Sequence, residues 1–368
     1  MKISVLINNH NYGEFIGEAI ESVLTQSYQD FEIVIVDGAS QDQSRNIIMS
    51  YVEKYPDRIT AVFKPTSGQA AAINAGFALS KGEVVAFLDS DDYFYETKLE
   101  RIAEQHKRYE FVGHARKALN YRKELMDVIA PLDDYEARPK LFHEYGYIYT
   151  YNLITSCISA KRELLSKILP MPEEEYMTFA DCYIKVMAQY YTNIKYIKEP
   201  LSFYRIHDLQ KTESFESFLD LNGFVETLYE RVFRDINFVL RERGEKTIPP
   251  LNAKNMRKAF KVANPHADIH EGGDYVIYGA GNNAYKVLKC LDAIGGRCVY
   301  FIDSDSKKWG TMWNGIPVLS FELLLSKRSD YQKIIIASPY FREMEQTLKT
   351  LGMCENIDFV TIYSFPND

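Results

Sequence analysis

Residues 84–92 read Val-Val-Ala-Phe-Leu-Asp-Ser-Asp-Asp, an apolar run that ends in three closely spaced carboxylates. A continuous apolar run of this length is typical of a buried strand in a parallel sheet. Asp89, Asp91 and Asp92 are therefore expected at the carboxyl edge of that strand, where open α/β sheets bind ligands. Neighbouring carboxylates repel one another, so they favour a bound cation. Mg²⁺ or Mn²⁺ takes oxygen ligands and commonly bridges to substrate phosphates. Taken alone, an Asp- and Ser-rich loop after a strand is more often ordinary turn chemistry.

The chain before this stretch alternates apolar runs with helical periodicity. Three further strands are expected at residues 3–7, 31–36 and 59–63, each followed by apolar residues at helical spacing. Strands that alternate with helices indicate βαβ units and a doubly wound α/β sheet. Polar or acidic residues follow the strands, which places Asn9, Asp37 and Asp89 on one rim.

Five motifs, in their order along the chain, resemble those of family 2 glycosyltransferases. They are residues 4–12 (SVLINNHNY), 22–28 (SVLTQSY), 36–40 (VDGAS), 68–76 (GQAAAINAG) and 89–92 (DSDD). The ordered set covers roughly the first 210 residues and is more specific than any single motif. The resemblance implies a GT-A-type nucleotide-sugar-binding fold with a mixed sheet and a DxD motif. Two positions depart from the family pattern: His10 stands where tyrosine is frequent, and Asp37-Gly38-Ala39-Ser40 stands where Asp-Asp-Gly-Ser is frequent.

The resemblance also implies roles for the residues around the donor. Asp91 would bind Mn²⁺ or Mg²⁺, which bridges to the diphosphate of the nucleotide sugar. Asp37 would hydrogen-bond the base and Asp89 would reach the ribose. Asn9 and Gln69 would position the nucleotide, and His10 would retune base stacking.

Asp181 is the predicted catalytic base. It lies near the start of a helical pattern at residues 179–188. A carboxylate in the first turn of a helix commonly caps it or offsets its dipole. In the family, a carboxylate at the start of this helix activates the acceptor hydroxyl, and transfer inverts the anomeric centre.

The segment Ile197–His207 resembles the family's closing segment, which often ends in Tyr-Arg-x-His. A lone histidine is more often structural than a ligand. By analogy with the motif, His207 would bind the same metal as Asp91. Arg205 would face the diphosphate, because its planar fork suits phosphate oxygens.

Residues 1–208 are thus expected to form the catalytic domain. A helical connector is expected at 209–265, since apolar residues there recur at steps of three and four. Such helices could pair two copies of the chain, although a packed connector is the simpler interpretation. A second, small Rossmann-like domain is expected at 266–368.

The second domain carries a Gly279-Ala280-Gly281-Asn282-Asn283-Ala284 turn after an apolar strand, with Asp303 about 20 residues beyond it, the spacing of a dinucleotide fingerprint. The region resembles the small nucleotide-binding domain beside sugar acyltransferases and sugar methyltransferases. No hexapeptide repeats occur, so acyl transfer is not implied. Gly279, Gly281 and Asp303 would bind a nucleotide-type ligand, or the domain would serve as an assembly surface and support a homo-oligomer.

Composition narrows the functional classes. The 368 residues are 46% hydrophobic and carry a net charge of −8, which favours two or three folded cores and disfavours nucleic acid as a partner. A strand from the third residue argues against a signal peptide, and no apolar run is long enough to span a bilayer. Five scattered cysteines without a CxxC motif suggest reduced thiols. The expected location is the cytoplasm, with peripheral association at the inner membrane face left open.

The sequence therefore predicts a metal-dependent, inverting glycosyltransferase. It would move a sugar from a nucleotide-diphosphate sugar to a glycan or lipid-linked acceptor, in surface polysaccharide or glycan biosynthesis. One alternative is a sugar nucleotidyltransferase, but residues 8–12 lack the glycine-rich basic loop that it would need. The other is a non-catalytic nucleotide-sugar sensor, which loss of Asp91 or Asp181 would have favoured.

Overall fold

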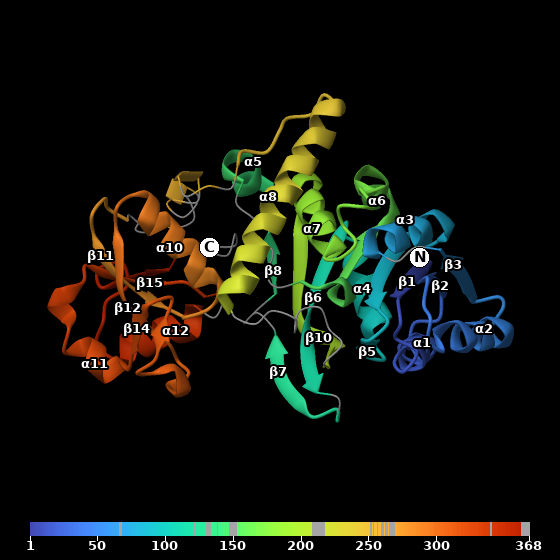
Figure 1. Cartoon of the computed structure of the whole chain (residues 1–368), viewed down its shortest axis with the longest axis horizontal. Coiled ribbons are helices and arrows are strands. Elements are labelled where there is room, and N and C mark those ends of the chain that lie inside the picture. The colour runs from blue at the N-terminus through green and yellow to red at the C-terminus, as the bar shows by residue number, and fades with distance from the viewer. Residues whose placement is uncertain are drawn as a thin grey trace. The chain divides into compact units, whose positions relative to one another are not determined.

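A computed structural model of the chain describes residues 1–65, 68–120, 122–129, 134–137, 139–146, 153–207, 218–250, 252, 254–255, 257–258, 261, 264, 269–338 and 341–361. Two compact units are present: residues 1–139 with 150–214, and residues 140–149 with 215–368 (Figure 1). The first part of the predicted connector, residues 209–217, lies outside the described residues. The three-part division at 208 and 265 stays a prediction.

The first unit is built on a ten-stranded sheet in the order β3-β2-β1-β4-β9-β6-β10-β5, with β7 beside β6 and β8 beside β10. Its strands are β1 (Ile3–Asn9), β2 (Phe31–Gly38), β3 (Ile59–Lys64), β4 (Val84–Asp89), β5 (Tyr93–Phe94), β6 (Phe111–Asn120), β7 (Leu125–Ile129), β8 (Tyr135–Ala137), β9 (Ile158–Lys161) and β10 (Ile194–Ile206). β1 to β4 are parallel, whereas β9 runs antiparallel between β4 and β6. The predicted mixed α/β sheet is confirmed.

Helices cover both faces of the parallel strands. They are α1 (Ile16–Leu24), α2 (Ser44–Lys54), α3 (Gln69–Leu79), α4 (Lys98–His106), α6 (Arg162–Ile168) and α7 (Ala180–Tyr191), with a 3₁₀ turn η1 at Thr155–Cys157. Alternate residues of a strand face opposite sides, so Ile3, Val5 and Ile7 pack into the core with α1, α2 and α4. On the other face α3 comes so close that a Cβ on Gly76 would lie 2.7 Å from Leu6. Figure 1 shows α3 on the opposite side of the sheet from α1 and α2.

The second unit contains a six-stranded sheet in the order β13-β14-β12-β11-β15-β16. Its strands are β11 (Asp274–Tyr278), β12 (Arg297–Ile302), β13 (Met312–Trp313), β14 (Ile316–Leu319), β15 (Lys333–Ile336) and β16 (Phe359–Thr361). Its helices are α5 (Pro139–Tyr145), α8 (Phe218–Glu242), α10 (Asn282–Ala293), α11 (Phe321–Leu325) and α12 (Phe341–Thr350), with 3₁₀ turns η3 (Ser306–Lys308) and η4 (Arg328–Asp330). All strands but β13 run parallel, which confirms a second α/β sheet.

Two further features bear on the class of protein. No helix in the described part of the chain is both long and apolar enough to cross a bilayer. All five cysteines are free thiols.

Candidate active site

The acidic turn Asp89–Asp92 lies at the end of β4, where residues of β1, α3 and η1 hydrogen-bond Asp89. Asp89 Oδ1 accepts hydrogen bonds from Asn8 Nδ2 at 2.8 Å and from Gln69 Nε2 at 3.2 Å. The Asp89 amide donates to Ser156 Oγ at 3.1 Å. The Asp92 amide donates to the Asp89 carbonyl at 3.0 Å, which closes the turn. The prediction that β4 delivers three carboxylates to the sheet edge is confirmed.

Negative charge in this turn is poorly compensated. Burial raises the pKa of Asp89 to about 7, and the charge of Asp91 adds to the effect. Burial also raises the pKa of Asp92 well above its usual range, again with the charges of Asp91 and Asp89 contributing. Each carboxylate disfavours ionisation of the next, since like charges in a buried site repel strongly. A cation at this edge would stabilise the ionised forms.

Asp91 and His207 lie together at the surface of this turn. His207 Nε2 is 3.1 Å from Asp91 Oδ2, and each residue is 8% exposed. The imidazole is also in ring contact with Phe15 and Tyr12. Within the described ranges, no three His, Cys, Asp or Glu side chains converge as metal ligands. Two protein ligands nevertheless fit Mg²⁺ or Mn²⁺, because such ions are commonly held by one or two side chains together with substrate phosphates and water.

Arg205 has a different set of contacts from the one predicted for it. Its Nη2 pairs with Glu18 at 2.6 Å, and its Nε donates to the Asp91 carbonyl at 2.9 Å. Its backbone amide donates to Asp92 Oδ1 at 3.0 Å. Arg205 is 5% exposed. The structure thus uses this arginine to hold the acidic turn, and its contact with a diphosphate stays a prediction.

Asn9 and Asp37 meet at the carboxyl ends of β1 and β2, where they are paired in register. Asn9 Nδ2 donates to Asp37 Oδ2 at 2.7 Å, and Ser40 Oγ donates to the same oxygen at 2.7 Å. Asn9 Oδ1 is buried and has no hydrogen-bond partner among the described residues. His10 Nδ1 donates to the Gly38 carbonyl, which joins the two turns again. At the carboxyl ends of β1 and β2, the Asn9 oxygen can therefore accept a further hydrogen bond, whereas the Asp37 carboxylate already has two donors. The base-binding roles of Asp37 and His10 stay predictions.

Asp181 is the second residue of α7, and its carboxylate is buried beside a lysine. Lys185 Nζ, one turn later, lies 2.8 Å from Asp181 Oδ2 and also donates to the Leu153 carbonyl. Gln69 connects this helix to the acidic turn, because its Oε1 accepts from the Ala180 amide at 3.1 Å while its Nε2 reaches Asp89. The charge of Asp181 is among those that raise the pKa of Asp89. Asp181 therefore lies near the predicted donor site, with its proton-accepting role untested.

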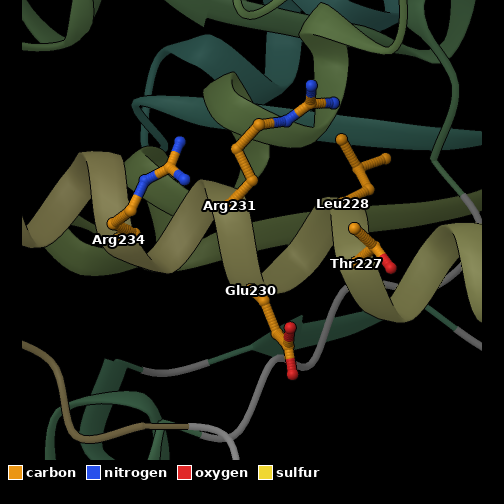
Figure 2. Close-up of a pocket in the computed structure, with 5 residues that line it drawn as sticks. All are labelled: Thr227, Leu228, Glu230, Arg231 and Arg234. Atoms are coloured by element: carbon orange, nitrogen blue, oxygen red, sulfur yellow. The ribbon is translucent and has the colours of Figure 1, made fainter.

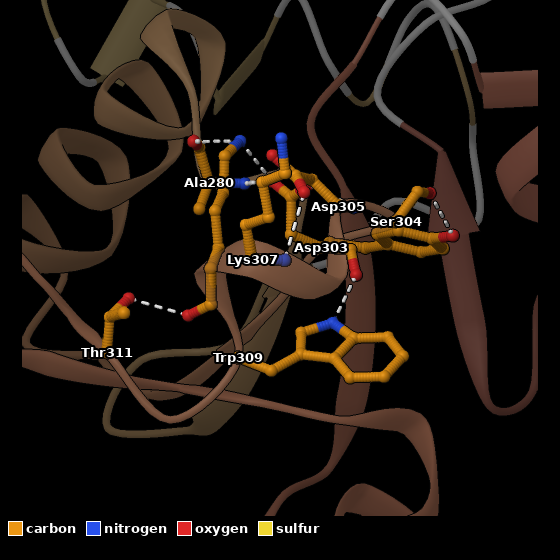
Figure 3. Close-up of polar contacts among 9 residues, drawn as sticks. Ala280, Asp303, Ser304, Asp305, Lys307, Trp309 and Thr311 are labelled. Atoms are coloured by element: carbon orange, nitrogen blue, oxygen red, sulfur yellow. Dashed lines mark hydrogen bonds and ion pairs between the residues drawn. The ribbon is translucent and has the colours of Figure 1, made fainter.

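The glycine turn of the second unit is closed by its own residues. Asp303 Oδ2 accepts from the Ala280 amide and pairs with Lys308 Nζ, both at 2.9 Å. Trp309 Nε1 donates to the Asp303 carbonyl at 2.8 Å. Figure 3 shows Ala280 and Trp309 meeting Asp303 from two sides. The carboxylate that the fingerprint assigns to a ribose thus has protein partners, and its binding role stays a prediction.

The glycines themselves differ in how much room they have. Gly279 has a φ of +100°, which favours glycine at that position. A Cβ on Gly281 would meet no described atom within 4 Å, so the described part of the chain leaves space beside the start of α10.

A separate hollow lies over α8. It has a volume of about 400 Å³ and is lined by Thr227, Leu228, Glu230, Arg231 and Arg234. Leu228, Arg231 and Arg234 extend from one side of the helix, while Glu230 points the other way (Figure 2). Arg234 pairs with Asp235 at 2.9 Å. None of the residues predicted from the sequence lines this hollow.

Sequence reasoning missed several residues that shape the site. Lys185 could have been found, since it lies four residues after Asp181 and side chains at that spacing meet on a helix. Asn8 lies beside a predicted residue, but strand alternation sends it to Asp89 instead of Asp37. Ser156 is 67 residues from Asp89, so no local pattern could have revealed it.

Comparisons with known proteins agree with this geometry. Residues 4–167 match the family described as glycosyl transferase family 2. An uncharacterized glycosyltransferase of Nostoc sp. is 38% identical over 215 residues, covering 56% of this chain and 65% of that protein. TuaG of Bacillus subtilis, whose name assigns it to teichuronic acid biosynthesis as a glycosyltransferase, is 36% identical over 118 residues, covering 31% of this chain and 46% of that protein. The chain thus spans less than two thirds of the length of either relative.

A crystal structure of Staphylococcus aureus TarS in complex with UDP-GlcNAc has a similar fold. The TM-score is 0.51 at 20% identity, and the match covers 64% of this chain and 66% of that one. Together with the family match, the acidic turn after β4 and the asparagine and aspartate rim of β1 and β2 lead to one conclusion. Residues 4–167 of this chain are similar to glycosyl transferase family 2, and its mixed sheet has a fold similar to that of TarS.

Proposed function

We propose that this protein transfers a sugar from a nucleotide-diphosphate sugar to an acceptor hydroxyl, with inversion at the anomeric carbon and with Mn²⁺ or Mg²⁺ bound. The observation that carries the proposal is the buried Asp89–Asp92 turn. Burial raises the pKa values of Asp89 and Asp92, and Asp91 lies against His207 at 3.1 Å. A turn of this charge is suited to a divalent cation, which would offset the charge that builds on the leaving nucleoside diphosphate.

The donor would lie along the carboxyl ends of β1, β2 and β4. Asp91 and His207 would hold the cation, and Asp89 would face the ribose. The free acceptor oxygen of Asn9 supports a base contact on this rim, because a buried acceptor without a partner gains free energy from an N–H donor. Asp37 and His10 would complete the base site, and Gln69 would position the nucleotide from the start of α3.

Asp181 would act as the general base. It would take the proton of the acceptor hydroxyl as the acceptor oxygen bonds to the anomeric carbon and the bond to the diphosphate breaks. Attack from the face opposite the leaving group inverts that carbon. Lys185 Nζ, 2.8 Å from Asp181 Oδ2, would hold the carboxylate in place at the start of α7. General-base assistance contributes roughly 10²–10⁴-fold in rate.

The acceptor would be a glycan or a lipid-linked glycan of a surface polysaccharide. The similarity to TuaG, named for teichuronic acid biosynthesis, supports this class of pathway. The five free cysteines support a location in the reducing cytoplasm, where the protein could also associate peripherally with the inner face of the membrane.

The second unit would hold a nucleotide-linked ligand or support self-association, without chemistry of its own. Open space beside Gly281 supports a small ligand near the start of α10, in the manner of the nucleotide-binding domains of sugar acyltransferases. Either this unit or the helical connector at residues 209–265 would mediate self-association into a homo-oligomer.

The test is a thermal-shift screen of the full chain against UDP, GDP, ADP and CMP, each with and without MnCl₂. We expect one nucleoside diphosphate to raise Tm only when the cation is present. Hydrolysis of the matching nucleotide sugar, followed with and without MnCl₂, then separates an enzyme from a sensor. Binding without any turnover, with or without acceptor glycans, would favour the sensor, and cation-independent binding of every nucleotide would contradict the proposal.

A further inference from the structure

Lys98 is the most deeply buried cation near the site, and no role in the reaction has been given to it. It is the first residue of α4, and its exposed fraction is 0%. Its Nζ donates to the Ser156 carbonyl at 2.7 Å and to Ser202 Oγ at 3.2 Å. It also lies 3.3 Å from the centre of the Phe94 ring.

This ammonium group has no carboxylate as an ion-pair partner in the described part of the chain. A buried lysine without such a partner is costly, and burial lowers the pKa of Lys98 well below its usual range. Exchange of buried charged groups for apolar ones of similar volume is often neutral or stabilising. Stability of the fold therefore gives no sufficient reason for a lysine here.

The two acceptors of Lys98 belong to the two segments that hold the acidic turn. Ser156 in η1 accepts a hydrogen bond from the Asp89 amide on its hydroxyl. Ser202 in β10 lies three residues before Arg205, which donates to Asp92 Oδ1 and to the Asp91 carbonyl. Lys98 therefore connects η1, which supports Asp89, to β10, which supports Asp91 and Asp92.

We propose that Lys98 is a positioning residue for the cation and diphosphate site, which fixes the acidic turn by joining η1 to β10. It does not touch the substrate. Its amine sets the distance between Ser156, which supports Asp89, and β10, which ends one residue before His207. With this link, Asp91 and His207 are held at ligand spacing before the donor arrives. The inference rests on the proposed function.

Lys98→Met is the first test, because methionine fills the space of the lysine stem without the amine. Ser202 Oγ already donates to the Ser156 carbonyl at 2.7 Å, so the variant leaves that buried oxygen with a partner. We expect Tm within a few degrees of wild type. Calorimetric affinity for UDP with MnCl₂, or for whichever nucleoside diphosphate the wild type selects, should fall about 10–100-fold, as is usual when a supporting partner of a metal ligand is lost. Mn²⁺ retained by the free protein, followed by electron paramagnetic resonance, should fall in parallel.

Lys107→Met is the matched control, since this lysine follows the same helix but its side chain is 68% exposed. It should leave affinity unchanged. If Lys98→Met fails to fold, Ser202→Ala is the second test of the link between η1 and β10. It removes the bonds of Ser202 Oγ to Lys98 Nζ and to the Ser156 carbonyl, and it should weaken affinity in the same direction.

The outcomes separate the two proposals. Wild type that binds no nucleoside diphosphate with MnCl₂ contradicts the proposed function and this inference with it. Wild type that binds, together with a folded Lys98→Met of equal affinity, contradicts the inference alone. A Lys98→Met protein with a much lower Tm and normal affinity below that Tm would make Lys98 a purely structural residue.

Discussion

The two sheets of this protein both end in aspartates at the carboxyl edge, yet the aspartates are neutralised differently. In the second unit, Asp303 meets a lysine amine and a backbone amide, each at 2.9 Å. In the first unit, Asp89 and Asp92 are buried beside Asp91, and their pKa values are raised. Arg205 reaches the turn through hydrogen bonds to the Asp91 carbonyl and Asp92 Oδ1, while its ion pair goes to Glu18.

The difference shows what an acidic strand end means for function. A carboxylate with a cation and an amide donor is electrostatically satisfied, so it stabilises its own turn. Carboxylates that raise the pKa of one another are held in a costly arrangement, and such arrangements cluster at functional sites. We call the carboxyl edge of the sheet in the first unit, with Asp89–Asp92, the first edge, and that of the second unit, with Asp303, the second edge. The first edge is therefore the stronger candidate for a site that binds a cation and a diphosphate.

Loss of the first edge should have the largest effect. Asp91→Asn should remove cation-dependent binding of nucleoside diphosphate and abolish transfer, because an amide is a poor ligand for a divalent cation in place of a carboxylate. Circular dichroism should show an intact fold. Asp305→Asn, at the corresponding edge of the second unit, is the matched control and should transfer normally. Undiminished turnover by Asp91→Asn would contradict the assignment of a functional cation site to the first edge.

The next largest effect is expected on the acceptor side of the first edge. Asp181→Asn should lower the transfer rate by about 10²–10⁴-fold while donor affinity stays close to normal, since the amide cannot take a proton. Single-turnover rates and calorimetry separate the two quantities. If donor affinity collapses and no separate effect on rate is found, Asp181 only caps α7 and pairs with Lys185.

Burial of Asp89 at the first edge, together with repulsion from Asp91, should also appear as a pH dependence of stability. The pKa of Asp89 is raised from 3.8 to about 7 in the folded state. Its contribution to stability is therefore present below about pH 4 and is lost as pH rises through about 7. MnCl₂ would offset this loss, so it should raise Tm by a few °C more at pH 8 than at pH 5. The Asp91→Asn protein should lack this difference, and an equal rise at both pH values would contradict the repulsion.

The smallest effect is expected when the second edge is made to resemble the first. Lys308→Met removes the ion pair with Asp303, and because the Lys308 side chain is 42% exposed the cost should be only about 0.5–1 kcal/mol. Both tryptophans of the chain, Trp309 and Trp313, lie in the second unit. Tryptophan fluorescence during urea unfolding therefore reports that unit. Lys307→Met should change neither stability nor transfer, and a large loss of transfer in Lys308→Met would show that the second edge takes part in the reaction.

Much of the first edge could be predicted because local patterns determine it. Alternating strands and helices give parallel strands, and parallel strands bring their carboxyl ends to one edge. The register that pairs Asn9 with Asp37, and Asn8 with Asp89, confirms that placement. The roles of these side chains toward a donor follow from the family resemblance and stay predictions.

The supports of the edge could not be predicted, because they come from distant parts of the chain. Lys98 meets Ser202 across 104 residues, and Arg205 meets Glu18 across 187. No periodicity carries information over such distances. The second edge shows the opposite difficulty: the spacing of Gly279, Gly281 and Asp303 is visible in the sequence, but the pairing of Asp303 with Lys308 is visible only in the folded unit.

The hydrogen-bond network of Asn9, Asp37 and Ser40 has a consequence for which substitutions related sequences can tolerate at these positions. Two donors share one oxygen of Asp37, so a change of Asp37 leaves the Asn9 amide and the Ser40 hydroxyl without this acceptor, whereas a change of Asn9 or Ser40 leaves Asp37 with the other donor. A second change at a partner position should then cost less than it would alone. Lineages that replace Asp37 are therefore expected to replace Asn9 and Ser40 as well, whereas replacement of Asn9 or Ser40 alone should leave the other two residues in place.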